Sequence, residues 1–342
     1  MAIPPHSMAE LEKHAQAGDV RAQYTLSALL GRMGRKEESR VWLAKAASGG
    51  DLEAQYTRAC LFLDGVDGPR NTKLAVEMLR ETADRGGMAA LRTLAVLTAL
   101  GIERTASMSD AIMLLRRAAG DGDTASIAQL RLIEQGSFSK PIPPKSELSR
   151  APNAWRMDQL LTPDECHHLV EAVTPYQHPS YVIDPQTGQT FRSTLRTSKT
   201  ATVHPFQQDL VMHLINQRLS DAAGLSLEQG EMLGVLMYEV GEQYRPHFDF
   251  LDPTAGASSQ FGSAGQRIAT LLVSLNDDFD GGETHFLSNK LNWRGKTGDA
   301  LLFWNVDGDG KPDPTTRHAG NPVTRGTKYL LSKWFREKPV AF

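Results

Sequence analysis

The sequence predicts a chain of two parts, an all-α helical-repeat solenoid followed by a β-rich domain that is supported by helices. Two observations lead to this prediction. A motif that begins with glycine recurs through the first part, and short β-branched and aromatic runs divided by Gly, Asn and Asp follow residue 232. We therefore expect helical repeats at 8–135, a Pro-rich linker at 136–152 and a second domain at 153–338.

The repeated motif reads AGDVRAQY at 17–24 and GGDLEAQY at 49–56, with weaker copies at 86–91 and 122–126. Its glycines at 18, 50, 86 and 122 are separated by 32, 36 and 36 residues. Such a period is typical of stacked helical hairpins, in which each glycine ends one helix. This part resembles the Sel-one-like branch of the tetratricopeptide repeats, and in that family such arrays bind proteins. The alternative is a helical cap that only solubilises or dimerises the second domain.

The linker contains GSFSKPIPPKS at 136–146, whose prolines predict an extended spacer. Beyond it, Thr162 precedes proline and two acids, a pattern that begins a helix. A second amphipathic helix is expected at 203–223. Strands are expected at 233–240, 267–275, 283–287, 299–304 and 327–336. Short strands after helices indicate a barrel or sandwich braced on one face by helices.

Composition excludes several classes of function. The chain has 37 basic and 40 acidic side chains and a formal charge of −3, which gives no basic surface for nucleic acid. Only Cys60 and Cys166 are present, so no disulfide framework or thiolate zinc site is expected. The start shows no charged region before an apolar core, and no apolar run approaches membrane-spanning length. We expect a cytoplasmic protein with no membrane partner.

A candidate iron site lies in the second domain. His247 and Asp249 are two residues apart, so on a strand their side chains project from the same face. His318 would add a third ligand. Two imidazoles and one carboxylate on one face of a metal leave three positions open, the arrangement that non-haem Fe(II) oxygenases use.

Lys328 and Thr284 would complete the pocket. Lys328 follows a turn at 325–326 and is expected to begin a strand that runs beside the strand of His318. A lysine inside a barrel needs an anion, and the carboxylate of a co-substrate is a natural partner. The run Gly281-Gly282-Glu283 predicts a tight approach to a strand, from which the Thr284 hydroxyl would face the same pocket.

Residues from about 153 to 337 resemble the prolyl 4-hydroxylase branch of the Fe(II)/2-oxoglutarate dioxygenases. The resemblance implies a double-stranded β-helix, or jelly roll, with helices on one side. It also implies an enzyme that uses Fe(II), 2-oxoglutarate and dioxygen, with ascorbate as a candidate reductant. The stretches that match are 196–198, 238–244, 265–270, 275–277, 281–284, 298–303, 318–328 and Trp334.

The resemblance assigns roles to individual residues. The segment 180–198 would be a mobile loop that folds over bound peptide. The intact carboxylate at 249 favours hydroxylation, because related halogenases leave that ligand position vacant. The iron ligands would be His247, Asp249 and His318. The contacts to 2-oxoglutarate would be Lys328, Tyr238 and Thr284. The contacts to peptide would be Arg267 together with Tyr244 and Trp334, the last two lining a proline pocket.

Two positions depart from the family pattern. Arg336 stands where relatives often carry histidine, and Ser274 stands where a tyrosine is common. Both belong to the substrate side, so the substrate stays open. The first hypothesis is hydroxylation of a prolyl residue in a protein that the repeats recruit. The second is hydroxylation of another residue, a free amino acid or a small metabolite, and the third is a repeat-based adaptor with a vestigial oxygenase domain.

Overall fold

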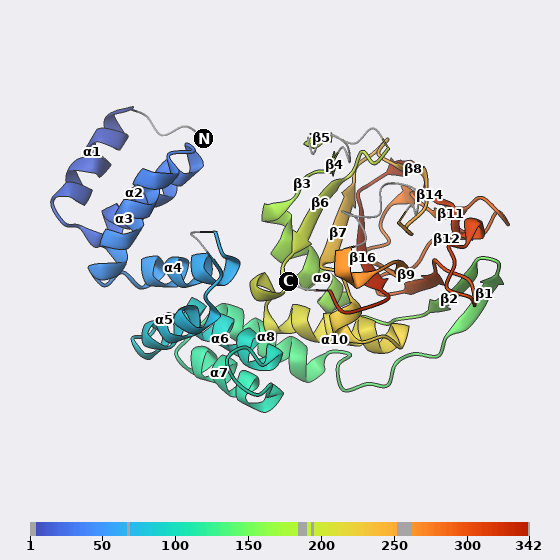
Figure 1. Ribbon diagram of the computed structural model, residues 1–342, viewed down its shortest axis with the longest axis horizontal. Helices are drawn as coiled ribbons and strands as arrows, with labels where there is room; N and C mark the ends of the chain where they lie inside the picture. The colour runs from blue at the N-terminus through green and yellow to red at the C-terminus, as the bar shows by residue number, and fades with distance from the viewer. Residues whose placement is uncertain (1–4, 67–68, 184–189, 193–194, 252–261, 341–342) are drawn as a thin grey trace. The chain divides into compact units, whose positions relative to one another are not determined.

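The computed structural model describes residues 5–66, 69–183, 190–192, 195–251 and 262–340. The chain divides into two compact units, Met1–Leu130 and Arg131–Phe342 (Figure 1). Among the described residues, no helix combines the length and apolarity that crossing a bilayer requires.

The first unit is all-α, as predicted. Its helices form successive antiparallel hairpins, and the last of them continues across the boundary between the units (Figure 1). The helices are α1 (Pro5–Gln16), α2 (Val20–Arg32), α3 (Lys36–Ser48), α4 (Leu52–Asp64), α5 (Thr72–Asp84), α6 (Met88–Leu100), α7 (Met108–Gly120) and α8 (Thr124–Gln135).

Each copy of the repeated motif forms a junction between two helices. Its glycine takes a left-handed backbone conformation, which glycine adopts without steric cost. The next residue is an aspartate in three of the copies, and the Asp19, Asp51 and Asp123 carboxylates accept backbone hydrogen bonds from the first turn of the following helix. The third copy has Gly87 in place of aspartate and lacks this cap. The junction glycines are Gly18, Gly50, Gly86 and Gly122, with φ between +89° and +98°.

The rest of the motif also repeats its contacts. The amide of Gln23 donates to the Ala15 carbonyl at 3.0 Å, and Gln55 donates to Ala47 at 3.0 Å in the next copy. In the same way, the Tyr24 hydroxyl lies 3.2 Å from Thr57 and the Tyr56 hydroxyl 3.2 Å from Thr93. Equivalent residues thus link equivalent helices, and the predicted helical-repeat solenoid is confirmed.

The second unit contains two main antiparallel sheets with two helices on one side (Figure 1). An eight-stranded sheet has the order β1-β2-β13-β9-β16-β7-β6-β3, and a four-stranded sheet has the order β12-β11-β14-β8. This is the jelly-roll class that was predicted. The elements are β1 (Ser146–Arg150), β2 (Asn153–Met157), α9 (Pro163–Val173), β3 (His178–Pro179), β4 (Tyr181–Ile183), β5 (Thr190–Arg192), β6 (Lys199–Val203), α10 (Leu210–Ala223), β7 (Leu233–Tyr238), β8 (Tyr244–His247), β9 (Arg267–Ser274), β10 (Asp280–Gly281), β11 (Thr284–Phe286), β12 (Asn292–Trp293), β13 (Ala300–Trp304), β14 (His318–Gly320), β15 (Val323–Arg325) and β16 (Lys328–Arg336).

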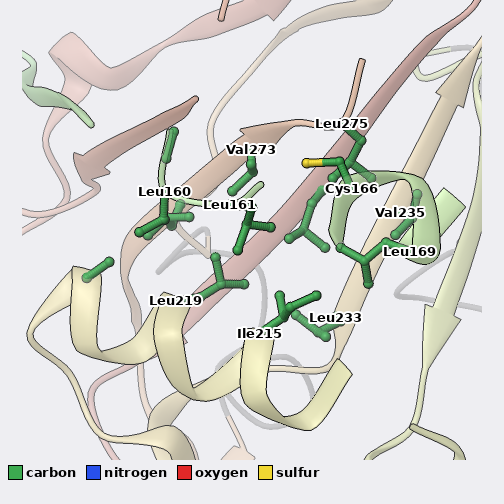
Figure 2. Packing of buried hydrophobic residues seen from close by; sticks show 14 of the residues in the cluster. Leu160, Leu161, Cys166, Leu169, Ile215, Leu219, Leu233, Val235, Val273 and Leu275 are labelled. Carbon is green, nitrogen blue, oxygen red and sulfur yellow. The ribbon is translucent and has the colours of Figure 1, made fainter. Parts of the chain in front are cut away.

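Strand alternation gives the eight-stranded sheet two apolar faces. Odd-numbered residues of β7, β9 and β16, such as Val235, Val273 and Leu331, pack against α9 and α10 (Figure 2). Even-numbered residues such as Leu236 and Leu272 lie in a second cluster with Phe286 of the four-stranded sheet. Because successive side chains of a strand point to opposite faces, one sheet separates a helix-side core from the interior between the sheets.

Helix boundaries follow their caps. A capping box joins Thr162 and Glu165 at the start of α9, as the sequence indicates. The predicted helix at 203–223 is shorter than expected, because residues up to 203 belong to β6 and Pro205 lies in a separate short turn of 3₁₀ helix. α10 begins only at Leu210, where the Asp209 carboxylate accepts from the Met212 backbone N–H.

The proline-rich segment is held against the second unit. The buried Glu165 carboxylate accepts from both the backbone N–H and the hydroxyl of Ser137. The Arg218 guanidinium donates to the carbonyls of Lys140 and Pro141 at 2.9 and 3.1 Å. After residue 145 the same stretch becomes strand β1. The prolines predict an extended segment but not these contacts, which attach it to Glu165 and Arg218.

Candidate active site

Three side chains converge between the two sheets. His318 is the direct ladder partner of His247, because β14 pairs with β8. The Nε2 atom of His247 lies 3.5 Å from Oδ1 of Asp249, and that of His318 lies 3.8 Å from Oδ2. One potential ligand atom from each residue lies within 4.8 Å of the others. The sequence placed these residues together, but Asp249 does not belong to the strand, since β8 ends at His247 and the aspartate lies in the bend that follows.

Both imidazoles are oriented by backbone carbonyls. Nδ1 of His247 lies 2.9 Å from the Arg245 oxygen, and Nδ1 of His318 lies 2.9 Å from the Thr316 oxygen. A carbonyl oxygen accepts only, so each Nδ1 carries a proton and each Nε2 faces Asp249. Metal-binding histidines commonly have this arrangement.

The electrostatics of the three groups suit a cation. Burial would raise the pKa of Asp249, but the His318 and His247 imidazoles outweigh it and hold this pKa well below its usual range. Burial, reinforced by His247, lowers the pKa of His318 to about 4 against the opposing charge of Asp249. At neutral pH the site therefore offers a neutral imidazole at 318 beside a carboxylate, a donor set that fits Fe(II).

The pocket floor is the interior face of the eight-stranded sheet. Every second residue of β16 lies on it, from Lys328 to Trp334, and Tyr238 on β7 is the ladder partner of Lys328. Thr284 on β11 lines the opposite side, so this predicted residue lies in the same pocket as the metal-site residues. The lining residues are Arg196, Leu236, Tyr238, Tyr244, His247, Asp249, Leu272, Thr284, His318, Gly320, Lys328, Leu330, Ser332 and Trp334.

Lys328 places a buried ammonium group in the pocket. Its side chain is only 4% exposed, and Nζ donates to the Gly282 carbonyl at 2.7 Å. Nζ also lies 5.3 Å from the centre of the Tyr238 ring. Burial lowers the pKa of Lys328 to about 8, with Glu283 opposing the shift. An ammonium has three N–H donors, so two remain for an anion as far as the described residues show.

The predicted strand partner of Lys328 is wrong. β16 pairs with β7 and β9 in the eight-stranded sheet, whereas His318 lies in the four-stranded sheet. The chain crosses between sheets after β14, through β15, which pairs with β10. Lys328 and His318 therefore face each other across the interior and line one pocket from opposite sides.

Arg267, the predicted contact to peptide, lies beside the pocket and packs on one of its lining residues. It is absent from the described lining, and its guanidinium forms two hydrogen bonds of 2.8 Å with the Glu231 carboxylate. It also lies 3.9 Å above the ring of Trp334, which does line the pocket. Glu231 accepts a further bond of 3.0 Å from Arg336. Glu231 belongs to no sequence motif, because it is a single acid before an apolar strand.

Tyr244 packs directly against the metal site. Its ring is stacked on His247 at a centroid distance of 3.4 Å and an interplanar angle of 13°. The Arg196 guanidinium lies 5.5 Å from the same ring and lines the pocket. The sequence predicts a family match at 196–198 but no role for the Arg196 side chain. In the predicted loop at 180–198, β4 pairs with β5, while residues 184–189 and 193–194 lie outside the described residues.

Comparison with known proteins agrees with this geometry. The model of the 2OG-Fe(II) oxygenase superfamily matches residues 233–336. Prolyl 4-hydroxylase 5 of Arabidopsis thaliana is 39% identical over 208 residues, which cover 55% of this chain and 69% of the plant protein. The chain belongs to the 2OG-Fe(II) oxygenase superfamily. Within it, the protein is a prolyl 4-hydroxylase-like dioxygenase that depends on iron and 2-oxoglutarate.

Two solved structures are similar to different parts of the chain. The viral collagen prolyl hydroxylase of Paramecium Bursaria Chlorella virus-1, in its 2OG complex, is 26% identical with a TM-score of 0.41, over 54% of this chain and 95% of the viral chain. A Sel1 repeat protein from Oxalobacter formigenes is 26% identical with a TM-score of 0.33, over 36% of this chain and 97% of that protein.

Proposed function

We propose that this dioxygenase hydroxylates a prolyl residue of a protein substrate and releases succinate and carbon dioxide as co-products. The observation that carries the proposal is the single pocket in which the donor set of His247, Asp249 and His318 faces the buried Lys328. When bound at these three residues, iron would supply the activation of dioxygen and the oxidation of a C–H bond. The protein would supply position and a cavity that excludes water.

Lys328 would bind the distal carboxylate of 2-oxoglutarate. A buried ammonium is costly without a counter-ion, and its described hydrogen bond is to an uncharged carbonyl. Tyr238 and Thr284 line the same pocket, and their hydroxyl groups would donate to the same carboxylate. The bound dicarboxylate would then extend from Lys328 toward the metal ligands on the opposite sheet.

The aromatic rings beside the metal site support a proline ring as the target. Tyr244 and Trp334 both line the pocket, and aromatic side chains suit contact with a small apolar ring. Arg267, whose guanidinium lies above Trp334, would contact the peptide substrate. The name of the plant relative, a prolyl 4-hydroxylase, supports the same choice.

The helical repeats would recruit the protein substrate. We propose the functional division that the sequence predicts, with repeats at 8–135, a linker at 136–152 and the dioxygenase at 153–338. Ascorbate as reductant and a cytoplasmic location stay predictions.

Mass spectrometry of cellular proteins tests the proposal. Cells that express the wild-type chain would be compared with cells that express His247→Ala, which removes one metal ligand and serves as the blank. We expect a gain of one oxygen on prolyl residues in wild-type cells only. A gain confined to lysine, asparagine or arginine would overturn the prolyl assignment, and no gain on any protein would favour a free amino acid or another small metabolite.

A further inference from the structure

A buried threonine on the interior face of β9 contacts the metal-site carboxylate. The Thr270 hydroxyl lies 2.8 Å from Oδ2 of Asp249. On its other side, the side-chain nitrogen of Asn305 lies 2.9 Å from the same hydroxyl oxygen. Thr270 and Asn305 are both 0% exposed, so no solvent competes for these bonds. None of the roles assigned to the pocket uses either residue.

The two hydrogen bonds have one possible direction. An ionised carboxylate only accepts, so the single proton of Thr270 must be donated to Asp249. The hydroxyl oxygen can then only accept from Asn305, which must present its amide N–H₂. Two backbone hydrogen bonds hold Asn305 in place. Its N–H donates to the Ile268 carbonyl at 2.8 Å, and its carbonyl accepts from the backbone N–H of Asp313 at 3.0 Å.

The sheet fixes the position of the hydroxyl. Thr270 is paired with Phe303 on one side and with Trp334 on the other. Its neighbours Ala269 and Leu271 point to the opposite face, where they belong to the helix-side core. Rotation of Thr270 away from Asp249 would leave a buried carboxylate oxygen without this donor, which is costly.

We propose that Thr270, oriented by Asn305, is a positioning residue that makes Asp249 a ligand through one oxygen only. The hydrogen bond from Thr270 uses one lone pair of Oδ2 and holds the carboxylate in one orientation, which favours Oδ1 as the metal-binding oxygen. A carboxylate that bound through both oxygens would take a second coordination position, and the co-substrates need the open positions. The inference rests on the proposed metal site at His247, Asp249 and His318. It adds that Thr270 determines how the Asp249 carboxylate binds the metal.

Cobalt(II) binding to the apoprotein tests this role without catalysis. Affinity would be measured by calorimetry, and coordination by the visible absorption of bound Co(II), for wild type, Thr270→Val, Thr270→Ser and His247→Ala. Valine keeps the shape of threonine and removes the donor. We expect Thr270→Val to bind Co(II) roughly 10–100-fold more weakly and with an altered spectrum, as for the loss of other groups that orient metal ligands. Thr270→Ser, which keeps the hydroxyl, should restore both readouts to within a few-fold of wild type.

A matched control separates positioning from general damage. Thr200 on β6 is a threonine of the same sheet that is 8% exposed, and its hydroxyl contacts Ser180 instead of the metal site. Thr200→Val should leave Co(II) affinity and spectrum unchanged, and all variants are compared by thermal unfolding. A folded Thr270→Val with wild-type affinity and spectrum overturns the inference. If instead wild type binds no more tightly than His247→Ala, the proposed metal site itself is wrong.

Discussion

His247 and His318 are direct partners in the ladder between β8 and β14, with ring centroids 4.2 Å apart. The chain between them builds β9 and β13 of the opposite sheet before it returns to β14. The pair therefore exists only when two segments that are distant in sequence have come together in the four-stranded sheet. Metal binding at these residues should be coupled to folding of the second unit, as in other metal sites assembled from distant segments.

Replacing Lys328 should stabilise the apoprotein at neutral pH. Burial lowers the pKa of Lys328 from 10.5 to about 8, so between these values the unfolded chain binds more protons and wild-type stability rises with pH. Lys328→Met removes the buried charge. We expect a gain on the order of 1–3 kcal/mol in the free energy of unfolding at pH 7, shrinking to nothing above about pH 10.5, measured by urea denaturation. Lys199→Met, at an exposed pair with Glu239, is the control. A variant less stable than wild type at pH 7 would contradict this account.

Removing the charge of Glu231 should damage both stability and substrate binding. Burial would raise the pKa of Glu231, but Arg267 and Arg336 outweigh this effect and lower it. Glu231→Gln would leave two largely buried guanidinium groups without their carboxylate, at a cost of about 3 kcal/mol. We expect the KM for peptide to rise while the KM for 2-oxoglutarate changes little, because Lys328 is not in this cluster.

A surface ion pair provides the comparison for Glu231. Glu239 pairs with Lys199 at 2.9 Å, and both side chains are well exposed. Glu239→Gln should cost less than about 1 kcal/mol and leave both KM values unchanged. Equal losses of stability in the two variants, or an unchanged peptide KM in Glu231→Gln, would show that the Glu231 cluster does not support the substrate side.

The repeat motif should contribute to stability through its helix caps. Asp51 accepts from the Ala54 backbone N–H at the start of α4. Asp51→Ala should lower the free energy of unfolding of the repeats by about 1 kcal/mol, whereas Asp51→Asn keeps an acceptor and should lose a few tenths at most. Denaturation followed by circular dichroism at helix wavelengths measures both. If alanine and asparagine behave alike, the cap is not the reason for the aspartate.

The sequence predicted the parts of the site that carry a pattern. The spacing of His247 and Asp249, followed by His318 and Lys328, predicts four residues that line one pocket of the structure. Glu231, Thr270 and Asn305 could not be found in this way. Each is one polar residue at the edge of or within an apolar run, and its partner lies on a distant segment of the chain whose position the sequence does not encode locally.

The same limit explains the errors in the fold. The apolar run at 327–336 predicts a strand but not its neighbours. The expected neighbour is the strand of His318, whereas β16 pairs with β7 and β9. The amphipathic pattern predicts a helix that begins at residue 203. In the structure this residue ends β6, and α10 begins after its N-cap residue Asp209. Strand pairing and caps depend on neighbours in space, which periodicity alone does not give.

We propose that one pocket holds iron on three side chains and 2-oxoglutarate on Lys328. An anaerobic titration of the Fe(II)-loaded protein with 2-oxoglutarate, followed by the visible charge-transfer absorption of the chelate, tests it directly. We predict a saturable band for wild type and no band for His247→Ala. For Lys328→Ala the same band should appear with a midpoint roughly 10–100-fold higher, corresponding to the loss of about 1.5–3 kcal/mol for a charged hydrogen bond. No band in wild type, or an unchanged midpoint in Lys328→Ala, would contradict it.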